Sequence, residues 1–132
     1  MLEKAERELQ RLRHDHTIDN LFNFFVTAYH IRDYVKEATT VPQHTLDSFL
    51  ADPDLQDCRA LCNKGKHLRL EHHPDALTSI ANGGFSGVSF SEVAFGEGQV
   101  RTLFYGSRAV DVHSLPERVV QKWKRFLSEH GL

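Results

Sequence analysis

The sequence has little of several features that mark specialised classes of protein. It contains two cysteines, four prolines and one tryptophan among 132 residues, which excludes a disulfide scaffold and a collagen-like repeat. No apolar run approaches the roughly 18–20 residues that a membrane helix needs. Neither charge predominates, because 16 Lys and Arg stand against 18 Asp and Glu, for a formal net charge of −2. A near-neutral chain is no bulk electrostatic trap for nucleic acid or membranes.

The start of the chain also lacks the apolar stretch of a secretion signal. Met1-Leu2-Glu3-Lys4 leads directly into a charged segment, so we expect a cytoplasmic protein that does not bind membranes. Hydrophobic residues make up 40% and charged residues 26% of the chain, which is the balance of an ordinary globular protein. The length predicts a single domain over residues 1–132, since domains usually hold about 100–200 residues.

Histidine is the residue that the sequence has in excess. The chain holds nine histidines, roughly three times ordinary usage. They are scattered, which argues against a histidine-rich metal tract. His14 and His16 flank Asp15 at a predicted helix boundary, where such residues are usually solvated or capping, and we expect a structural role for both.

The two cysteines, Cys58 and Cys62, lie four residues apart on a predicted helix. A zinc site there would need histidine ligands from elsewhere in the chain. The alternative is a pair of reduced thiols that pack as small hydrophobic side chains in the core. We therefore expect no metal and no cofactor.

Hydrophobic spacing predicts that the first half of the chain is helical. Residues 1–13 carry a narrow apolar stripe. Residues 18–38 have large apolar side chains at i, i+3, i+4, i+7, i+8 and i+11, the strongest helical pattern in the chain. Pro42 ends that helix, and a short helix then begins at Thr45 or Asp47. Asp52 precedes a helix over residues 53–70.

The second half changes to a strand-like composition. Asn82-Gly83-Gly84 predicts a turn. Imperfect alternation over residues 88–95 indicates a strand with a bulge near Ser91 and Glu92. After a hairpin-type turn at Gly96-Glu97-Gly98, we expect strands over residues 100–105 and 109–112.

A final helix is predicted over residues 115–130. Ser114 and Glu117 have the spacing of a capping box, and Gly131 is a plausible stop. The order of elements indicates an α+β fold, in which a bundle of three to four helices precedes an antiparallel β-hairpin or small meander and a C-terminal helix. The helical part covers about residues 1–73, and the hairpin and last helix cover about residues 85–131.

Polar side chains on two of these helices are the best candidates for a functional site. Arg59, Asn63 and His67 lie at i, i+4 and i+8, on a helix face next to the apolar stripe. His30 and Asp33 lie at i and i+3 on the earlier helix. If the two helices pack antiparallel, both sets could meet at one end of the bundle.

Such a set has the chemistry to cleave a phosphodiester without a metal ion. His67 can donate or accept a proton near neutral pH, and Asp33 can fix the tautomer of a histidine. Arg59 can bind a phosphate through two hydrogen bonds, and Asn63 can orient a hydroxyl or phosphate oxygen. Two lysines beside the site would attract a polyanion: Lys64 and Lys66.

The same residues also fit a purely structural role. Polar side chains at helical spacing in a bundle often form a hydrogen-bond network that fixes packing. In that interpretation Arg59 would simply pair with Asp33 or Asp57.

The segment Asn63-Lys64-Gly65-Lys66-His67 follows an N-x-x-K-H pattern. Together with the run from Phe22 to Val35, it resembles a group of small bacterial proteins to which no activity is assigned. The resemblance covers about residues 18–70.

The arrangement of Arg59 and His67 also resembles, more loosely, the HEPN superfamily of helical bundles found in many toxins and defence ribonucleases. In that family an Arg, a polar residue, four to six further residues and a His build a metal-independent ribonuclease site from two subunits of a dimer. Here seven residues separate Arg59 from His67, and Ala60 replaces the polar residue. HEPN-like proteins without nuclease activity serve as scaffolds or nucleotide binders, so that role stays open.

The sequence therefore predicts an RNA-cleaving or RNA- or nucleotide-binding protein, HEPN-like and homodimeric, of a toxin or phage-defence system. Arg59, Asn63 and His67 would carry the site, with support from His30 and Asp33. The alternative is a non-enzymatic interaction module. It would bind a protein partner or a second copy through the predicted hairpin and its aromatic residues: Phe90, Phe95, Phe104 and Tyr105.

Overall fold

Six helices and one small sheet make up the described part of the chain. The computed structural model describes the backbone of residues 1–70, 79–82, 85–88, 102–105 and 108–132, and the side chains of residues 1–63, 102–104 and 108–132. The helices are α1 (Leu2–His14), α2 (Ile18–Tyr29), α3 (Ile31–Ala38), α4 (Gln43–Leu50), α5 (Pro53–Leu70) and α7 (Leu115–Glu129).

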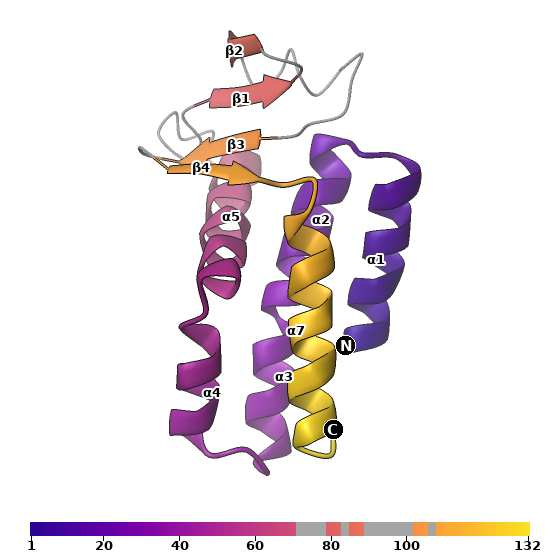
Figure 1. Ribbon diagram of the computed structural model, residues 1–132, viewed down its shortest axis with the longest axis vertical. Coiled ribbons are helices and arrows are strands. Elements are labelled where there is room, and N and C mark those ends of the chain that lie inside the picture. Colours follow the sequence, from indigo (N-terminus) through magenta and orange to yellow (C-terminus); the bar gives the residue numbers. More distant parts are fainter. Residues whose placement is uncertain (71–78, 83–84, 89–101, 106–107) are drawn as a thin grey trace.

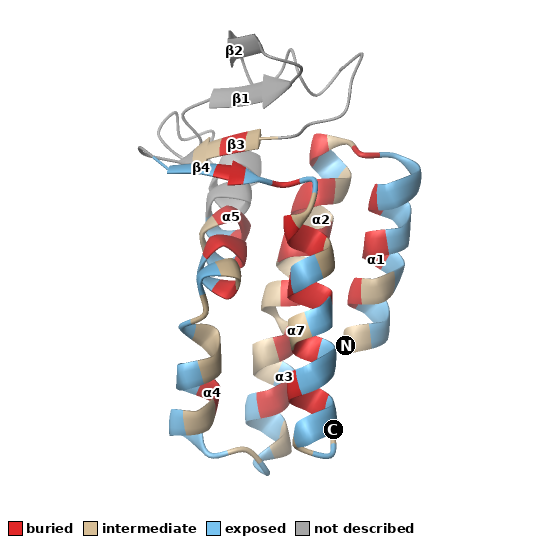
Figure 2. Cartoon of the chain, viewed as in Figure 1, coloured by how far each residue is buried: buried red, intermediate tan, exposed pale blue. Residues whose placement is uncertain are grey.

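The helices form a bundle whose members run alternately up and down (Figure 1). Helix α1 is followed by the antiparallel α2, which α3 continues, and α5 runs back beside α2 toward the sheet. The last helix, α7, contacts α1, α2 and α5. The inward faces of these helices are buried along the length of the bundle (Figure 2), because each carries apolar residues at helical spacing.

The sheet lies across one end of the bundle (Figure 1). Its strands are β1 (Ser79–Asn82), β2 (Phe85–Val88), β3 (Thr102–Tyr105) and β4 (Arg108–Asp111), in the order β2-β1-β3-β4 with antiparallel neighbours. Leu103 of β3 pairs with Val110 of β4. Both side chains are buried in the same hydrophobic core as the helices, and β3 and β4 therefore close one end of the core.

The structure confirms the predicted α+β class, with a helical bundle before the strands and a helix after them. Helix α5 has the predicted bounds, with Pro53 at its first position and Asp52 accepting a hydrogen bond from the Asp54 amide at 2.8 Å. Thr17 caps α2 through the Asn20 amide. Gly131 follows α7 with a φ of +69°, the left-handed conformation that suits glycine at a helix end.

The predicted single helix over residues 18–38 is wrong in one respect, because it is divided at His30 into α2 and α3. The Nδ1 atom of His30 lies 2.6 Å from the Val26 carbonyl oxygen. The His30 amide donates to that same oxygen at 3.2 Å. A side chain that competes for a helix carbonyl interrupts the regular ladder of backbone hydrogen bonds.

The capping box predicted at Ser114 and Glu117 is also wrong. Ser114 precedes α7 but caps it with no side-chain hydrogen bond. Its hydroxyl instead donates to Asp111 at 3.1 Å. Glu117 accepts a hydrogen bond from Arg13 of α1, so a tertiary partner has replaced the local one.

The strand predictions succeeded only in part. Strands β3 and β4 confirm the strands expected over residues 100–105 and 109–112, within two residues at each end. Strands β1 and β2, which pair with each other, were not predicted. The strand with a bulge at residues 88–95 and the turn at residues 96–98 lie almost wholly outside the described residues.

Opposite charges link the start of α5 to α7 and β4. Asp57 is 5% exposed, and its two carboxylate oxygens accept hydrogen bonds from Nε and Nη2 of Arg108 at 2.6 and 2.7 Å. Lys122 of α7 lies 2.7 Å from Asp52 and 2.9 Å from Asp54. A further pair joins Arg118 to Asp54. We call these six residues the acidic clamp: Asp52, Asp54, Asp57, Arg108, Arg118 and Lys122.

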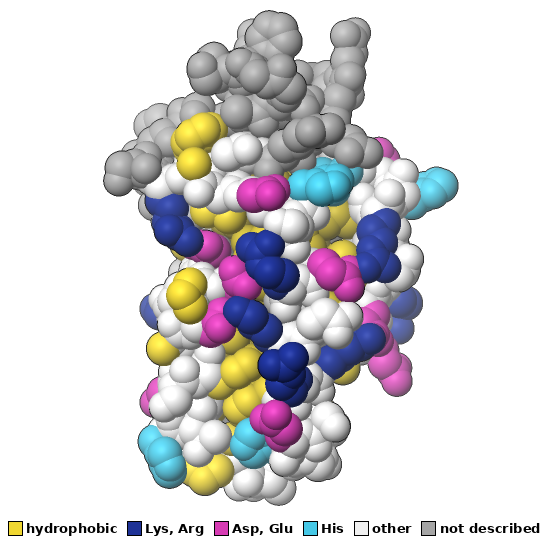
Figure 3. All heavy atoms as spheres, viewed as in Figure 1, with side chains coloured by type: hydrophobic (Ala, Val, Ile, Leu, Met, Phe, Trp, Pro, Cys, Tyr) yellow, Lys and Arg dark blue, Asp and Glu magenta, His cyan; other side chains and the backbone are white. Residues whose placement is uncertain are grey.

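Figure 3 shows basic and acidic side chains lying next to one another on one face of the molecule. Arg118 donates to both oxygens of Asp54, at 3.0 and 3.2 Å. This hydrogen bonding, and to a lesser degree that of Lys122, lowers the pKa of Asp54 below its usual value. Cations held in this way have their charge neutralised locally. The acidic clamp is therefore a structural link rather than a basic surface for a polyanion.

Candidate functional site: a histidine cavity

The two predicted polar sets lie in different parts of the bundle. Helices α2 and α5 are antiparallel neighbours (Figure 1), and the Cys58 thiol donates to the Phe25 carbonyl at 3.8 Å, which fixes their relative level. From that level His30 lies five residues along α2 in one direction, and His67 lies nine residues along α5 in the other. At 1.5 Å per residue their backbones are roughly 20 Å apart along the bundle. The backbones of His30 and His67 therefore do not meet at one end of the bundle.

On α5 two of the predicted residues have described side chains. Arg59 and Asn63 are exposed. Among the described residues Arg59 has no ion pair, so the proposed pairing with Asp33 or Asp57 is absent and Asp57 binds Arg108 instead. The backbone of His67 is helical, and its side chain lies outside the described residues, as do two more predicted side chains: Lys64 and Lys66.

On the earlier helix His30 and Asp33 make local contacts. The imidazole of His30 reaches back to the Val26 carbonyl. Asp33 lies 3.4 Å from Nε of its neighbour Arg32, whose guanidinium covers the Tyr29 ring at 4.2 Å. These contacts shape the junction of α2 and α3.

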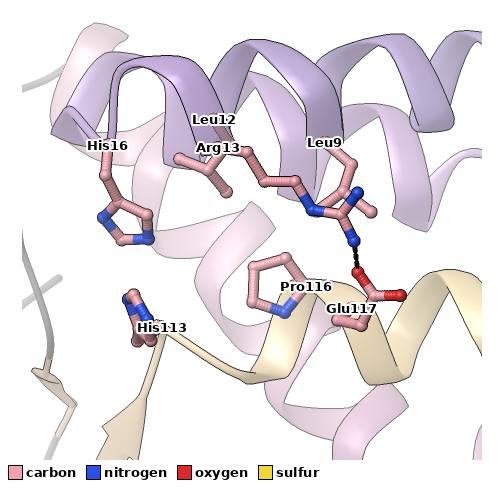
Figure 4. A pocket seen from close by; sticks show the side chains of 7 residues that line it. All are labelled: Leu9, Leu12, Arg13, His16, His113, Pro116 and Glu117. Carbon is pink, nitrogen blue, oxygen red and sulfur yellow. Dashed lines mark hydrogen bonds and ion pairs between the residues drawn. The ribbon is translucent and has the colours of Figure 1, made fainter.

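The described residues contain a different set of polar side chains around a cavity of about 220 Å³. Figure 4 shows two imidazole rings, of His16 and His113, at one end of this cavity and the ion pair of Arg13 and Glu117 at the other. The ring centroids are 5.5 Å apart. We call this site the histidine cavity, and three apolar side chains complete its lining: Leu9, Leu12 and Pro116.

The turn between α1 and α2 places His16 in the cavity. Asp15 ends α1, with its amide donating to the Arg11 carbonyl at 2.8 Å. The Thr17 amide donates to the Asp15 carbonyl at 2.9 Å, and the Thr17 side chain then caps α2. This tight connection holds the backbone of His16 at the end of the bundle, so that its ring faces α7.

A second turn, between β4 and α7, places His113. Asp111 accepts a hydrogen bond from the His113 amide at 2.9 Å and another from the Ser114 hydroxyl at 3.1 Å. Burial acts to raise the pKa of Asp111, but these hydrogen bonds outweigh it and the pKa is lowered. The ionised carboxylate fixes the turn that carries His113.

The two imidazoles have different surroundings. His16 is 9% exposed, and neither of its ring nitrogens has a hydrogen-bond partner among the described residues. Burial lowers the pKa of His16, and the neighbouring charge of His113 lowers it further. The opposing effects are smaller, and they come from the backbone of Val112, then from the backbone of His16 itself and from the carboxylate of Asp111. His16 is therefore held as a neutral base, whereas the side chain of His113 is exposed.

This arrangement suits proton transfer and anion binding. A neutral imidazole beside an exposed one supplies an acceptor and a donor near neutral pH. Arg13 adds a guanidinium with the geometry for two hydrogen bonds to a phosphate. Among the described residues, no three His, Cys, Asp or Glu side chains gather in a way that could hold a metal ion.

Sequence analysis missed the histidine cavity, because it interpreted His14 and His16 alike. His14 is exposed at the end of α1, while His16 is buried. The excess of histidine was the available signal. It could not point to His16 and His113 together, because they come from opposite ends of the chain.

Comparison of the chain with family models, curated proteins and solved structures finds no match. The resemblance to HEPN proteins and to the small bacterial group therefore stays a prediction from the sequence. In the part of the chain that the structure describes, no helix has the length and apolar character needed to cross a lipid bilayer.

Proposed function

We propose that the protein cleaves RNA without a metal ion and that the histidine cavity is the catalytic site. One observation carries the proposal: two imidazoles of unequal burial lie 5.5 Å apart at the end of a cavity, and the buried one has no hydrogen-bond partner among the described residues. A buried polar group left in this way costs stability. Sites of catalysis and binding are where such groups are commonly found.

The reaction is an internal transfer of the phosphoryl group. His16, the neutral base, takes the proton of a ribose 2′-hydroxyl, and the 2′-oxygen attacks the adjacent phosphorus. The bond from phosphorus to the 5′-oxygen breaks, and the imidazolium of His113 donates a proton to that oxygen. The products are a 2′,3′-cyclic phosphate and a free 5′-hydroxyl. After the reaction His16 carries the proton and is charged, and His113 is neutral.

Arg13 has the other role that this chemistry needs. Negative charge builds on the phosphate oxygens as the 2′-oxygen attacks, and a guanidinium that donates two hydrogen bonds stabilises that charge. Leu9, Leu12 and Pro116 make the remaining wall apolar. An apolar wall lowers the local dielectric constant and so strengthens these interactions.

The test is an RNA cleavage assay with matched histidine variants. Purified protein is incubated with mixed cellular RNA in EDTA, and the ends are analysed for 2′,3′-cyclic phosphate. We expect His16→Asn and His113→Asn each to lower the rate by about 10²–10⁴-fold. His14→Asn, two residues from His16 but exposed, should leave the rate unchanged.

Two results would sink the proposal. Cleavage that persists in both cavity variants would place the catalytic site elsewhere or reveal a contaminating nuclease. No cleavage by well-folded protein would favour the alternative, an interaction module that binds a protein partner.

The exposed face of α5 is a second candidate for RNA cleavage or binding. It is favoured by Arg59, which is exposed and makes no ion pair with another described residue. In the HEPN-like proposal Arg59 and His67 would act across a homodimer in a toxin or phage-defence system. His67→Ala in the same assay separates this site from the histidine cavity. A cytoplasmic location also remains part of the proposal.

A further inference from the structure

Arg13 and Glu117 form an ion pair at the far end of the histidine cavity, and we call it the exchangeable pair because an anion can replace Glu117. Arg13 is the one Lys or Arg among the described residues that line the cavity, and its guanidinium donates to Glu117. Both side chains are well exposed, at 50% for Arg13 and 43% for Glu117. Solvent screens such a pair, so an incoming anion meets little resistance in replacing one partner.

Glu117 keeps a second partner that does not depend on Arg13. Nε2 of Gln121, one turn further along α7, donates to Oε1 of Glu117 at 3.1 Å, whereas Arg13 contacts the other oxygen, Oε2. If Arg13 turns to a ligand, the carboxylate retains this hydrogen bond and its contact with water. The exchange therefore leaves no buried charge behind.

His16 supplies an independent sign that the cavity holds a ligand. Its ring is 9% exposed, lines the same cavity and has two nitrogens without hydrogen-bond partners among the described residues. The cavity has room for several water molecules, each of which needs about 30 Å³ in the liquid, and hence for one phosphate group. A phosphate there would offer acceptor oxygens to Arg13 and to the imidazoles.

We infer that the histidine cavity binds a phosphate group and that Glu117 is the competing internal anion, which the phosphate displaces from Arg13. The inference rests on the proposed function for its choice of ligand, since a phosphodiester substrate must place its phosphate here. In addition, Glu117 lowers the affinity of the site for phosphate, because its carboxylate binds the Arg13 guanidinium that the phosphate would bind.

The experiment is a titration with inorganic phosphate, followed by NMR signals of the His16 and His113 rings. Glu117→Gln removes the competing charge but keeps an amide that can bond to Gln121. We expect this variant to bind phosphate about two- to fivefold more tightly than the natural chain, which is the range that the loss of an exposed ion pair allows. Arg13→Gln should weaken phosphate binding at least about tenfold, since a charged hydrogen-bond donor is lost.

The chain offers a matched control in Glu6→Gln. Glu6 of α1 pairs with Lys124 of α7 at 2.7 Å, so it joins the same two helices and carries the same charge, but it does not line the cavity. Its removal changes the net charge of the protein equally. Phosphate affinity should stay the same in this variant, and a gain in Glu117→Gln alone would support the inference.

The inference is overturned if phosphate shifts neither ring signal, or if Glu117→Gln and Glu6→Gln bind it equally. Parallel titration with a dinucleotide that lacks the 2′-hydroxyl tests whether a phosphodiester binds as inorganic phosphate does. Phosphate binding without RNA cleavage would support this inference while contradicting the proposed function. RNA cleavage with an unchanged phosphate affinity in Glu117→Gln would support the proposed function and contradict this inference.

Discussion

The acidic clamp and the histidine cavity both adjoin the first turns of α7, but they treat polar groups in opposite ways. In the acidic clamp, the buried carboxylate of Asp57 has both oxygens bonded to Arg108 at 2.6 and 2.7 Å. In the histidine cavity, the buried ring of His16 has no such partner among the described residues. The polar groups of the acidic clamp bind one another and link α5 to α7 and β4. In the histidine cavity, the imidazole of His16 and the exposed guanidinium of Arg13 line the cavity.

A structural cluster differs from a candidate site in whether its polar groups are bonded to one another. The acidic clamp has more charges than the histidine cavity, yet its cations and carboxylates are paired with one another. The histidine cavity has fewer charged groups, but the desolvation of its buried imidazole outweighs the effects of its neighbours and lowers the pKa of His16. An unpartnered imidazole that lines a cavity, rather than charge density, marks the candidate site.

The largest stability effect should come from the acidic clamp. Arg108→Ala leaves the carboxylate of Asp57, which is 5% exposed, without its bidentate partner. Because Arg108 itself is half exposed, we expect the free energy of unfolding to fall by about 1–3 kcal/mol rather than by the full cost of a buried pair. Chemical denaturation measures this change. Arg59→Ala is the control, with an expected change below about 0.5 kcal/mol, and equal losses in the two variants would contradict the role of Asp57.

The opposite sign is expected in the histidine cavity. His16→Leu replaces a buried imidazole that lacks hydrogen bonds by an apolar side chain beside Leu12 and Pro116. We expect the free energy of unfolding to rise by about 1 kcal/mol, while RNA cleavage and phosphate binding are lost. A clear drop in the denaturation midpoint would mean that His16 has a structural partner, and the comparison with the acidic clamp would fail.

The pH dependence of stability should also differ between the two regions. The pKa of His16 is lowered in the folded state, from about 6.5 in an unfolded chain. As the pH falls below about 6.5, the unfolded chain gains a proton there before the folded chain does, so stability decreases. Denaturation of the natural chain and of His16→Leu at a series of pH values tests this. The difference between the two should grow below about pH 6.5, and a constant difference would refute it.

The acidic clamp responds at a lower pH. The hydrogen bond from Arg118 lowers the pKa of Asp54 in the folded state, so its contribution is complete above the usual aspartate pKa of about 3.9 and is lost below it. Asp54→Asn should therefore flatten the stability curve only in strong acid. If the stability curve of Asp54→Asn flattened near neutral pH instead, the lowered pKa of Asp54 would be contradicted.

The smallest effect is expected from the exchangeable pair. Glu117→Gln removes an exposed ion pair, and we expect the free energy of unfolding to fall by about 0.2–1 kcal/mol. Glu6→Gln, which breaks the other ion pair between α1 and α7, should cost a similar amount. A loss of several kcal/mol in Glu117→Gln would show that the pair is a structural lock rather than an exchangeable contact.

The helical half of the molecule was predictable because its signals are local. The apolar positions of residues 18–38 recur every three to four residues, and Leu21, Phe22 and Phe25 are indeed buried. Asp52-Pro53 marked the start of α5 correctly. Predictions that depended on distant partners failed. Strand β1 was not predicted, and its neighbour β3 is separated from it in the chain by β2.

The candidate site shows the same limit more sharply. Arg59, Asn63 and His67 stood out because helical spacing placed them on one face, but spacing along α5 carries no information about the level at which α2 packs against it. Ser114 and Glu117 matched a local capping pattern, yet Glu117 found Arg13, 104 positions earlier in the chain. A local hydrogen-bond motif does not form when the fold places an opposite charge next to one of its side chains.

The sequence by itself determined the α+β class, the positions of most helices and the face of each that is buried, because these follow from periodicity within a few turns of chain. Only the tertiary structure decided which of nine histidines lie together. His16 and His113 are in turns at the two ends of the chain, and they meet because α1 and α7 pack side by side. Burial, which separates His16 from its neighbour His14, is a property of that packing and not of the residue.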